Sequence, residues 1–208
     1  MPTVLIIGNA SPTFDARPHV ERADYIVRFN GCAGLHQQYG SRTHRVYLCN
    51  TGSVARRFIR DPEIINRLTS TGTEEIVFSY PRIPISRLAY CTLIGKRGTA
   101  IDRTLQLGQV LNQSGQRWSR LPQSVFDTAV QRIKTTPGFT EFRRRAPVWA
   151  PSSGCLALMH IAHDPLFADH EIHVLGFGFN GWEGHPWFAE RAFAETLQRA
   201  GRLRFMDR

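Results

Sequence analysis

The sequence predicts an α/β protein with one mostly parallel sheet, and three observations point that way. Short apolar runs, each bounded by turn residues, are typical of buried strands in such a sheet. These runs occupy residues 4–7, 25–30, 46–50, 76–78 and 171–177. Helical patterns alternate with the runs. The chain has 208 residues, of which 42% are hydrophobic, enough for the core of one large α/β unit.

The sequence signals for helices between the first four apolar runs are weaker than those for the strands. Residues 35–39 read as a short helix that ends at Gly40, a residue type that commonly stops a helix. Another helix starts at residues 51–53 and is expected to break near Pro62. We interpret residues 11–22 as a loop with one helical turn.

Residues 81–150 follow a less regular pattern, with helices predicted near 99–111 and 123–133. In a small enzyme, such a region commonly shapes the site of a second substrate. We therefore interpret it as an acceptor-site insertion within a single domain that spans residues 1–208.

The charge balance favours acidic ligands without naming one. The chain has 26 Lys+Arg against 17 Asp+Glu, a formal net charge of +9, and almost all of the positive charge is arginine. Arginine suits phosphate and carboxylate, so a nucleotide, an anionic sugar or an anionic membrane surface would fit. A solvated arginine-rich surface explains the charge equally well. We expect no nucleic-acid partner, because the arginines are dispersed and no binding motif is present.

Nothing in the sequence indicates a metal site, an export signal or a membrane span. Cys32, Cys49, Cys91 and Cys155 lie far apart, so we expect reduced and mostly buried thiols. The histidines form no HxxxH or HExxH pair. No apolar run approaches the ~18–20 residues of a membrane helix. We expect a cytoplasmic protein, with peripheral contact at the inner face of the membrane left open.

The ends of the first two strands look like parts of a binding site. Gly8 and Asn9 follow the first apolar run, and Asn30 ends the second. Ligands of open α/β sheets bind at these carboxyl ends. Glycine allows close approach, and asparagine offers a donor and an acceptor. The turn lacks the GxGxxG and P-loop spacings, and a plain turn between strand and helix is the alternative.

Two further positions carry possible chemistry near the end of the chain. Ser152 and Ser153 precede Gly154 and an apolar helix, where serines cap free amides and a helix start can hold phosphate. His185 precedes Pro186 at the start of the final helix, which runs to about residue 201. A neutral histidine there could accept a proton from a hydroxyl. Simple capping or packing remains the alternative for both positions.

Taken in order, these segments resemble the animal-type sialyltransferases, glycosyltransferase family 29. The family's long, short and very short motifs are each matched by segments in the right order. The matching segments are VLIIGNAS (4–11), DYIVRFN (24–30), YGSRT (39–43), PSSGCLAL (151–158), VLGFG (174–178) and HPWFAE (185–190). Together they cover a little under half of the chain.

The resemblance implies a Rossmann-like sheet of the sialyltransferase type, a GT-A-like variant. It also implies inverting transfer, without a metal ion or cofactor, of an acidic sugar from a CMP donor to a glycan or lipid-linked glycan. Asn9 and Asn30 would hold the CMP part, while Ser152, Ser153 and Gly154 would lie at its ribose or phosphate.

Gly8, Ser11 and Gly176 would belong to the same donor site, and His185 would be the general base. Glu190, the other end of the very short motif, lies about 140° around a helix from His185. We therefore expect a structural role for Glu190.

The resemblance is incomplete on the phosphate side, where the family carries a further histidine. Arg28, His36, Arg42 and Tyr47 are the candidates to replace it. Sialic acid is the expected donor sugar, and 3-deoxy-manno-octulosonic acid, also activated by CMP, is the alternative. A protein that binds CMP without catalysis is the alternative from a different class.

Overall fold

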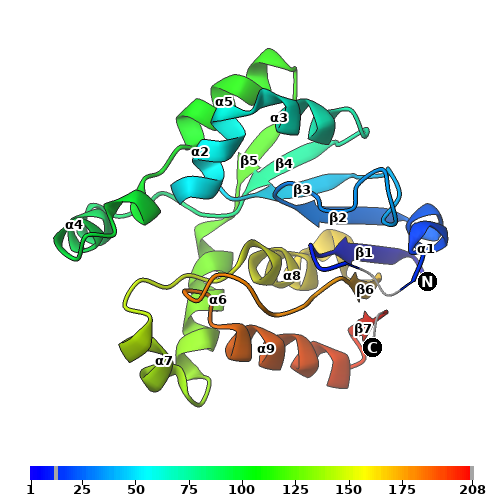
Figure 1. Ribbon diagram of the computed structural model, residues 1–208. Helices are drawn as coiled ribbons and strands as arrows, with labels where there is room; N and C mark the ends of the chain where they lie inside the picture. Colours follow the sequence, from blue (N-terminus) through cyan, green and yellow to red (C-terminus); the bar gives the residue numbers. More distant parts are fainter. Residues whose placement is uncertain (12–13, 207–208) are drawn as a thin grey trace.

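The computed structural model describes residues 1–11 and 14–206 and confirms the α/β class (Figure 1). Within these residues, seven strands form one sheet in the order β5-β4-β3-β2-β1-β6-β7, and all neighbouring strands are parallel. The strands are β1 (Thr3–Ile7), β2 (Tyr25–Phe29), β3 (Arg45–Leu48), β4 (Glu75–Phe78), β5 (Trp118–Arg120), β6 (Glu171–Leu175) and β7 (Leu203–Phe205).

All five predicted strands are therefore present. The sequence missed β5 and β7, the two strands at the edges of the sheet. Each has three residues, too few for a recognisable apolar run.

Helices cover both faces of the sheet, with α2, α3 and α5 on one face and α6, α8 and α9 on the other (Figure 1). The α-helices are α1 (Arg17–Arg22), α2 (Gly52–Arg60), α3 (Pro62–Thr69), α4 (Ile85–Leu93), α5 (Thr104–Gln113), α6 (Gln123–Thr135), α7 (Phe139–Arg145), α8 (Ser153–His163) and α9 (Trp187–Arg199). Two short 3₁₀ helices are η1 (Arg97–Ala100) and η2 (Pro165–Phe167).

Alternating side chains of the strands fill the two layers. In β3, Val46 and Leu48 join the core under α2, α3 and α5, whereas Tyr47 between them joins the core under α8. All three are fully buried. Apolar residues on both faces explain why the strands read as continuous apolar runs.

Two predicted helix positions need correction. Residues 35–39 form turns rather than a helix, because Gly34 and His36 have φ of +72° and +63°, outside the right-handed helical region. The last helix begins at Trp187, so His185 lies in the preceding loop and Pro186 precedes the first helical residue. The expected break at Pro62 is confirmed, since α2 ends at Arg60 and α3 begins at Pro62.

The region 81–150 contributes to the main fold as well as to its periphery. It contains α4, η1, α5, β5, α6 and α7. β5 pairs with β4, and α6 packs against α8 and α9. By contrast, α4 extends away from the sheet (Figure 1). An acceptor-site role for part of this region stays a prediction.

The order of the strands reverses between β1 and β6. The chain builds the sheet outward from β1 to β5 and then returns to place β6 on the other side of β1. Such a reversal leaves a crevice at the carboxyl ends of the two strands, where open α/β sheets bind ligands. In the described part of the chain, no helix has the length and apolar character needed to cross a membrane.

Candidate functional site

A cavity of about 280 Å³ lies at this reversal. Its lining comes from the ends of β1, β2 and β6, the start of α8 and the loop before α9. Eight of the nine site residues predicted from the sequence line it: Gly8, Asn9, Asn30, Ser152, Ser153, Gly154, Gly176 and His185. The ninth, Ser11, is exposed and lies outside the lining. The fold therefore brings five separate segments of the chain together.

Two glycines let the ends of β1 and β6 approach each other. The N–H of Gly8 donates to the Leu175 carbonyl (2.7 Å), and the N–H of Ala10 donates to that of Gly176 (3.1 Å). A Cβ at Gly8 would overlap the Gly176 carbonyl. Gly176 has φ of +69°, and a Cβ there would meet the hydroxyl of Tyr39. Both positions therefore require glycine.

Asn9 and Asn30 hold the neighbouring backbone through their side-chain oxygens. Oδ1 of Asn30 accepts from the Cys49 N–H (2.8 Å), and Oδ1 of Asn9 accepts from the Ala33 N–H (3.1 Å). Asn30 adopts φ of +51°, a conformation that asparagine tolerates better than most residues. Both side chains line the cavity, and their NH₂ groups form no hydrogen bond to the described residues. Two NH₂ groups, with four N–H donors, therefore remain for a ligand.

Ser152 caps α8, and its polar groups are engaged within the protein. Its hydroxyl accepts from the Cys155 N–H (3.1 Å) and donates to Oε2 of Glu190 (2.6 Å). Its N–H donates to Oε1 of Glu190 (2.8 Å). Ser153 and Gly154 follow in the first turn of α8, where N–H groups have no partner within the helix and favour an anion. Those two residues are better placed than the Ser152 hydroxyl to meet a phosphate.

Glu190 is buried, with 3% of its surface exposed. Burial raises the pKa of its carboxyl to about 7, although the bonds from Ser152 act in the opposite direction. Within the described part of the chain, the carboxylate of Glu190 accepts both of its hydrogen bonds from Ser152 and none from His185. This agrees with the structural role expected from the sequence.

His185 is held in one tautomer by the backbone. Its Nδ1 lies 2.8 Å from the carbonyl oxygen of Ala150, which can only accept, so Nδ1 carries the proton. Nε2 therefore keeps its lone pair. The rings of Trp182 and Trp187 pack against the imidazole, with centroids at 4.8 and 5.0 Å. Burial lowers the pKa of His185, so the ring is neutral near pH 7, as a general base must be.

Several lining residues were missed by the sequence analysis. They are Ala10, Phe29, Cys49, Val54, Tyr80, Phe177, Gly178, Phe179, Asn180, Trp187 and Glu190. The signal was available for some of them, because Cys49, Tyr80 and Phe177 all lie one or two residues after a strand. Tyr80 also donates its hydroxyl to the Pro151 carbonyl (2.8 Å), which positions the segment before α8.

None of the four candidates for a phosphate-side donor lines the cavity. Arg28 is buried and donates to the Tyr39 carbonyl (2.6 Å), while Arg42 donates to that of Glu21 (2.8 Å). Tyr47 bonds to His160 on α8, and His36 is exposed. The arginines stabilise the loop after β2 instead. The lining contains no lysine or arginine, so the start of α8 is its main positive feature.

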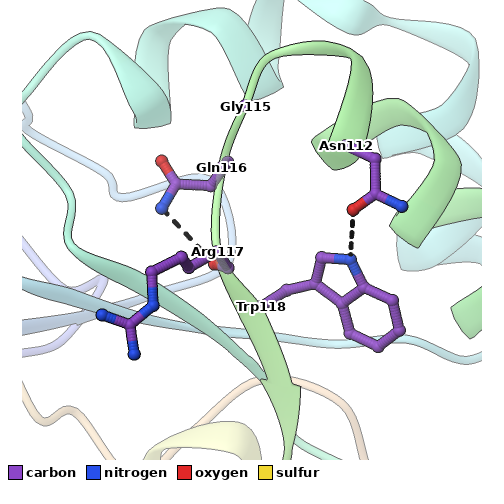
Figure 2. Close-up of a pocket in the computed structure, with 5 residues that line it drawn as sticks. All are labelled: Asn112, Gly115, Gln116, Arg117 and Trp118. Carbon is purple, nitrogen blue, oxygen red and sulfur yellow. Dashed lines mark hydrogen bonds between the residues drawn. The ribbon is translucent and has the colours of Figure 1, made fainter.

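A further hollow of about 390 Å³ lies at the start of β5 (Figure 2). Its wall includes Trp118, whose Nε1 donates to Oδ1 of Asn112 (2.9 Å). It lies at the amino end of its strand and shares no lining residue with the candidate site. Across the described residues, no three His, Cys, Asp or Glu side chains are grouped to hold a metal ion.

Comparison with known proteins gives two relationships. No family model matches the chain. The "Urease operon 23 kDa accessory protein" of Rhizobium meliloti (strain 1021) is 27% identical over 205 residues, which cover 97% of this chain and 91% of that protein. The fold is similar to that of the sialyltransferase CstII from Campylobacter jejuni, determined in complex with the substrate analogue CMP-3FNeuAc.

The match to CstII has a TM-score of 0.55 and 13% sequence identity, and it covers 100% of this chain and 82% of that chain. At this identity, the similarity establishes a shared fold. The similar sequence is thus that of a protein described as a urease accessory protein, and the similar fold is that of a sialyltransferase.

Proposed function

We propose that this chain is an inverting, metal-independent glycosyltransferase related to the animal-type sialyltransferases. It would move an acidic sugar, sialic acid by default, from a CMP donor to a hydroxyl of a glycan or lipid-linked glycan. The observation that carries the proposal is the presence of His185, with an unprotonated Nε2, in one cavity with the start of α8. A base and an anion-binding helix end are what this reaction requires.

The donor would lie across the ends of β1, β2 and β6. The NH₂ groups of Asn9 and Asn30 are suited to the acceptor atoms of the CMP part. The N–H groups at Ser153 and Gly154 are suited to its phosphate. The N–H groups belong to the backbone of α8, and the asparagine side chains are held by their bonds to backbone N–H groups. These donors therefore need little reorganisation when charge develops on the leaving group.

In the transfer step, Nε2 of His185 takes the proton of the acceptor hydroxyl. The resulting oxygen attacks the anomeric carbon from the side opposite the phosphate, and the bond from that carbon to the phosphate oxygen breaks. CMP leaves with the electron pair, and the configuration at the anomeric carbon inverts. CMP is a good leaving group, so a base, anion-stabilising donors and positioning are sufficient.

Two alternatives to this proposal concern the donor sugar and the presence of catalysis. A donor carrying 3-deoxy-manno-octulosonic acid has the same CMP group and a carboxylate. A CMP-binding protein without catalysis is favoured by two observations: the lining lacks a cationic side chain, and the relative from Rhizobium meliloti is described as an accessory protein. The predicted cytoplasmic location and contact with an anionic membrane surface belong to the proposal as well.

Calorimetric titration with CMP, with GMP and AMP as controls, tests the donor site. We expect selective CMP binding that weakens in Asn9→Ala, because its side chain is exposed and lines the cavity. Asn112→Ala is the matched control, since Asn112 lines the separate hollow at β5. A folded protein with no preference for CMP would overturn the assignment.

Transfer assays with CMP-sialic acid and CMP-3-deoxy-manno-octulosonic acid separate the remaining readings. We expect product with one of them and loss of product in His185→Ala, while CMP affinity is retained. CMP binding without transfer to any tested glycan would favour the non-catalytic alternative.

A further inference from the structure

A second cavity, of about 350 Å³, lies between the first turn of α2 and the segment that links α4 to η1. We call it the basic cavity. Three of its nine lining residues are cations, Arg56, Lys96 and Arg103, and none is acidic. They come from three places in the chain: α2, the residue before η1 and the residue before α5. The cations are therefore brought together by the tertiary structure.

The basic cavity adjoins the candidate donor site. Gly52 and Ser53 in the first turn of α2 line the basic cavity, and Val54, the next residue, lines the donor cavity. Val54 is 40% exposed. The N–H of Arg103, which also lines the basic cavity, donates to the Asn50 carbonyl (2.9 Å). This bond holds Arg103 close to the end of β3. A ligand in the basic cavity would lie beside the donor.

Among residues 1–11 and 14–206, no salt bridge joins Arg56, Lys96 or Arg103 to an acidic side chain. The nearest acid in sequence, Asp102, pairs with Arg120 (3.0 Å) and accepts two bonds from Thr104. Arg103 donates from Nη1 to Gln106 (3.0 Å), while its buried Nε has no partner in the described part of the chain. A buried donor without a partner is costly, and an anion would satisfy it.

We propose that the basic cavity is an anion subsite that receives the acidic group of the acceptor, a carboxylate or a phosphate. This proposal rests on the proposed function. The donor cavity contains no lysine or arginine in its lining, and the three cations next to it have no acidic partner in the part of the chain that the structure describes. A guanidinium fork and the N–H groups of the first turn of α2 are suited to both anions. The preferred acceptor is therefore acidic.

Titration of ¹⁵N-labelled protein with sodium phosphate or D-glucuronate, at constant ionic strength set with NaCl, tests anion binding. The amide signals of Gly52, Gly95 and Gly98 report on the basic cavity. We expect saturable shifts in the wild type and roughly tenfold weaker binding in the double variant Arg56→Gln/Lys96→Gln. Arg57→Gln is the matched control, because Arg57 is exposed on the same helix and outside the cavity.

The two anions distinguish the two sources of negative charge. Tighter binding of phosphate would indicate a phosphorylated acceptor, and tighter binding of glucuronate an acidic sugar. Equal shifts in the wild type and the double variant, or equal weakening in Arg57→Gln, would overturn the anion subsite.

CMP provides the separate test of the donor site. Its signals are the amides of Gly8 and Gly176, and we expect them to shift equally in the wild type and the double variant. Absence of CMP shifts together with intact anion binding would overturn the proposed function and leave the anion subsite standing.

A transfer assay with 3′-sialyllactose and lactose tests the link to the acceptor. We expect the double variant to raise KM for the acidic acceptor roughly tenfold and to leave KM for lactose and for the donor unchanged. Equal effects on both acceptors, or transfer to neither, would overturn the acceptor assignment.

Discussion

The carboxylate of Glu190 accepts two hydrogen bonds from Ser152, one from its N–H (2.8 Å) and one from its hydroxyl (2.6 Å). The two residues are 38 positions apart in the chain. Glu190 lies in the first turn of α9, and Ser152 caps α8. Because His185 lies just before α9, this link fixes the proposed base relative to the helix end that would bind phosphate.

Substitution of Ser152 and of Ser153 by alanine should have different effects on stability. Ser152→Ala removes a helix cap and a partner of Glu190, so we expect the free energy of unfolding to fall by about 1–2 kcal/mol. Ser153→Ala keeps the backbone N–H that would meet the phosphate, so it should leave both stability and CMP binding nearly unchanged. Urea unfolding and calorimetry measure the two quantities. Equal destabilisation by both variants would contradict this division of roles.

The buried carboxyl of Glu190 should make stability depend on pH. The pKa of this carboxyl is about 7 in the folded protein, against an ordinary value of 4.5, which applies to the unfolded chain. As the pH rises, the unfolded chain therefore loses the proton at a lower pH than the folded protein does. The free energy of unfolding should therefore fall between about pH 4.5 and 7 by at most ~3 kcal/mol and level off above that range.

Glu190→Gln should remove this pH-dependent contribution, which appears as the difference between wild-type and variant unfolding curves across that range. Glu183→Gln, at an exposed position, should retain it. A wild-type and Glu190→Gln pair with parallel curves would show that Glu190 ionises normally.

His185 should set the acid limb of the transfer rate. Burial lowers its pKa, so the ring stays neutral to a lower pH than an ordinary histidine with a pKa of 6.5. We expect the rate to fall only below that pH, and His185→Ala to reduce kcat by about 10²–10⁴ without changing CMP affinity. An acid limb that persists in the residual activity of His185→Ala would assign the titration to another group.

Gly176→Ala should lower stability by more than its backbone angle alone explains. Gly72 has a similar φ (+74° against +69°) but open space around it, so Gly72→Ala measures the strain of a positive φ, about 1 kcal/mol. At Gly176 the added Cβ also meets the Tyr39 hydroxyl. Thermal unfolding should show the larger loss for Gly176→Ala, and equal losses would mean that both Tyr39 and the Ala10 carbonyl, which the Cβ would also meet at 3.0 Å, move aside without cost.

Parts of this molecule were predictable because their signals are local. The buried strands appear as apolar runs, and the residues at their ends, Gly8, Asn9 and Asn30, mark the carboxyl ends of the strands, where a cavity lies. The edge strands β5 and β7 were missed, because three residues give no pattern. The turns at residues 35–39 were mistaken for a helix, because positive φ at His36 has no clear signal in the sequence.

The sequence alone determined the α/β class and eight of the residues that meet at the cavity, since both depend on the order of short segments along the chain. Only the tertiary structure decided which partners those residues have. The carbonyl of Ala150 selects the tautomer of His185, Glu190 engages Ser152, and Arg28 turns to the backbone rather than to the cavity. These contacts join segments separated by 11 to 38 residues, so they exist only once folding has brought the segments together.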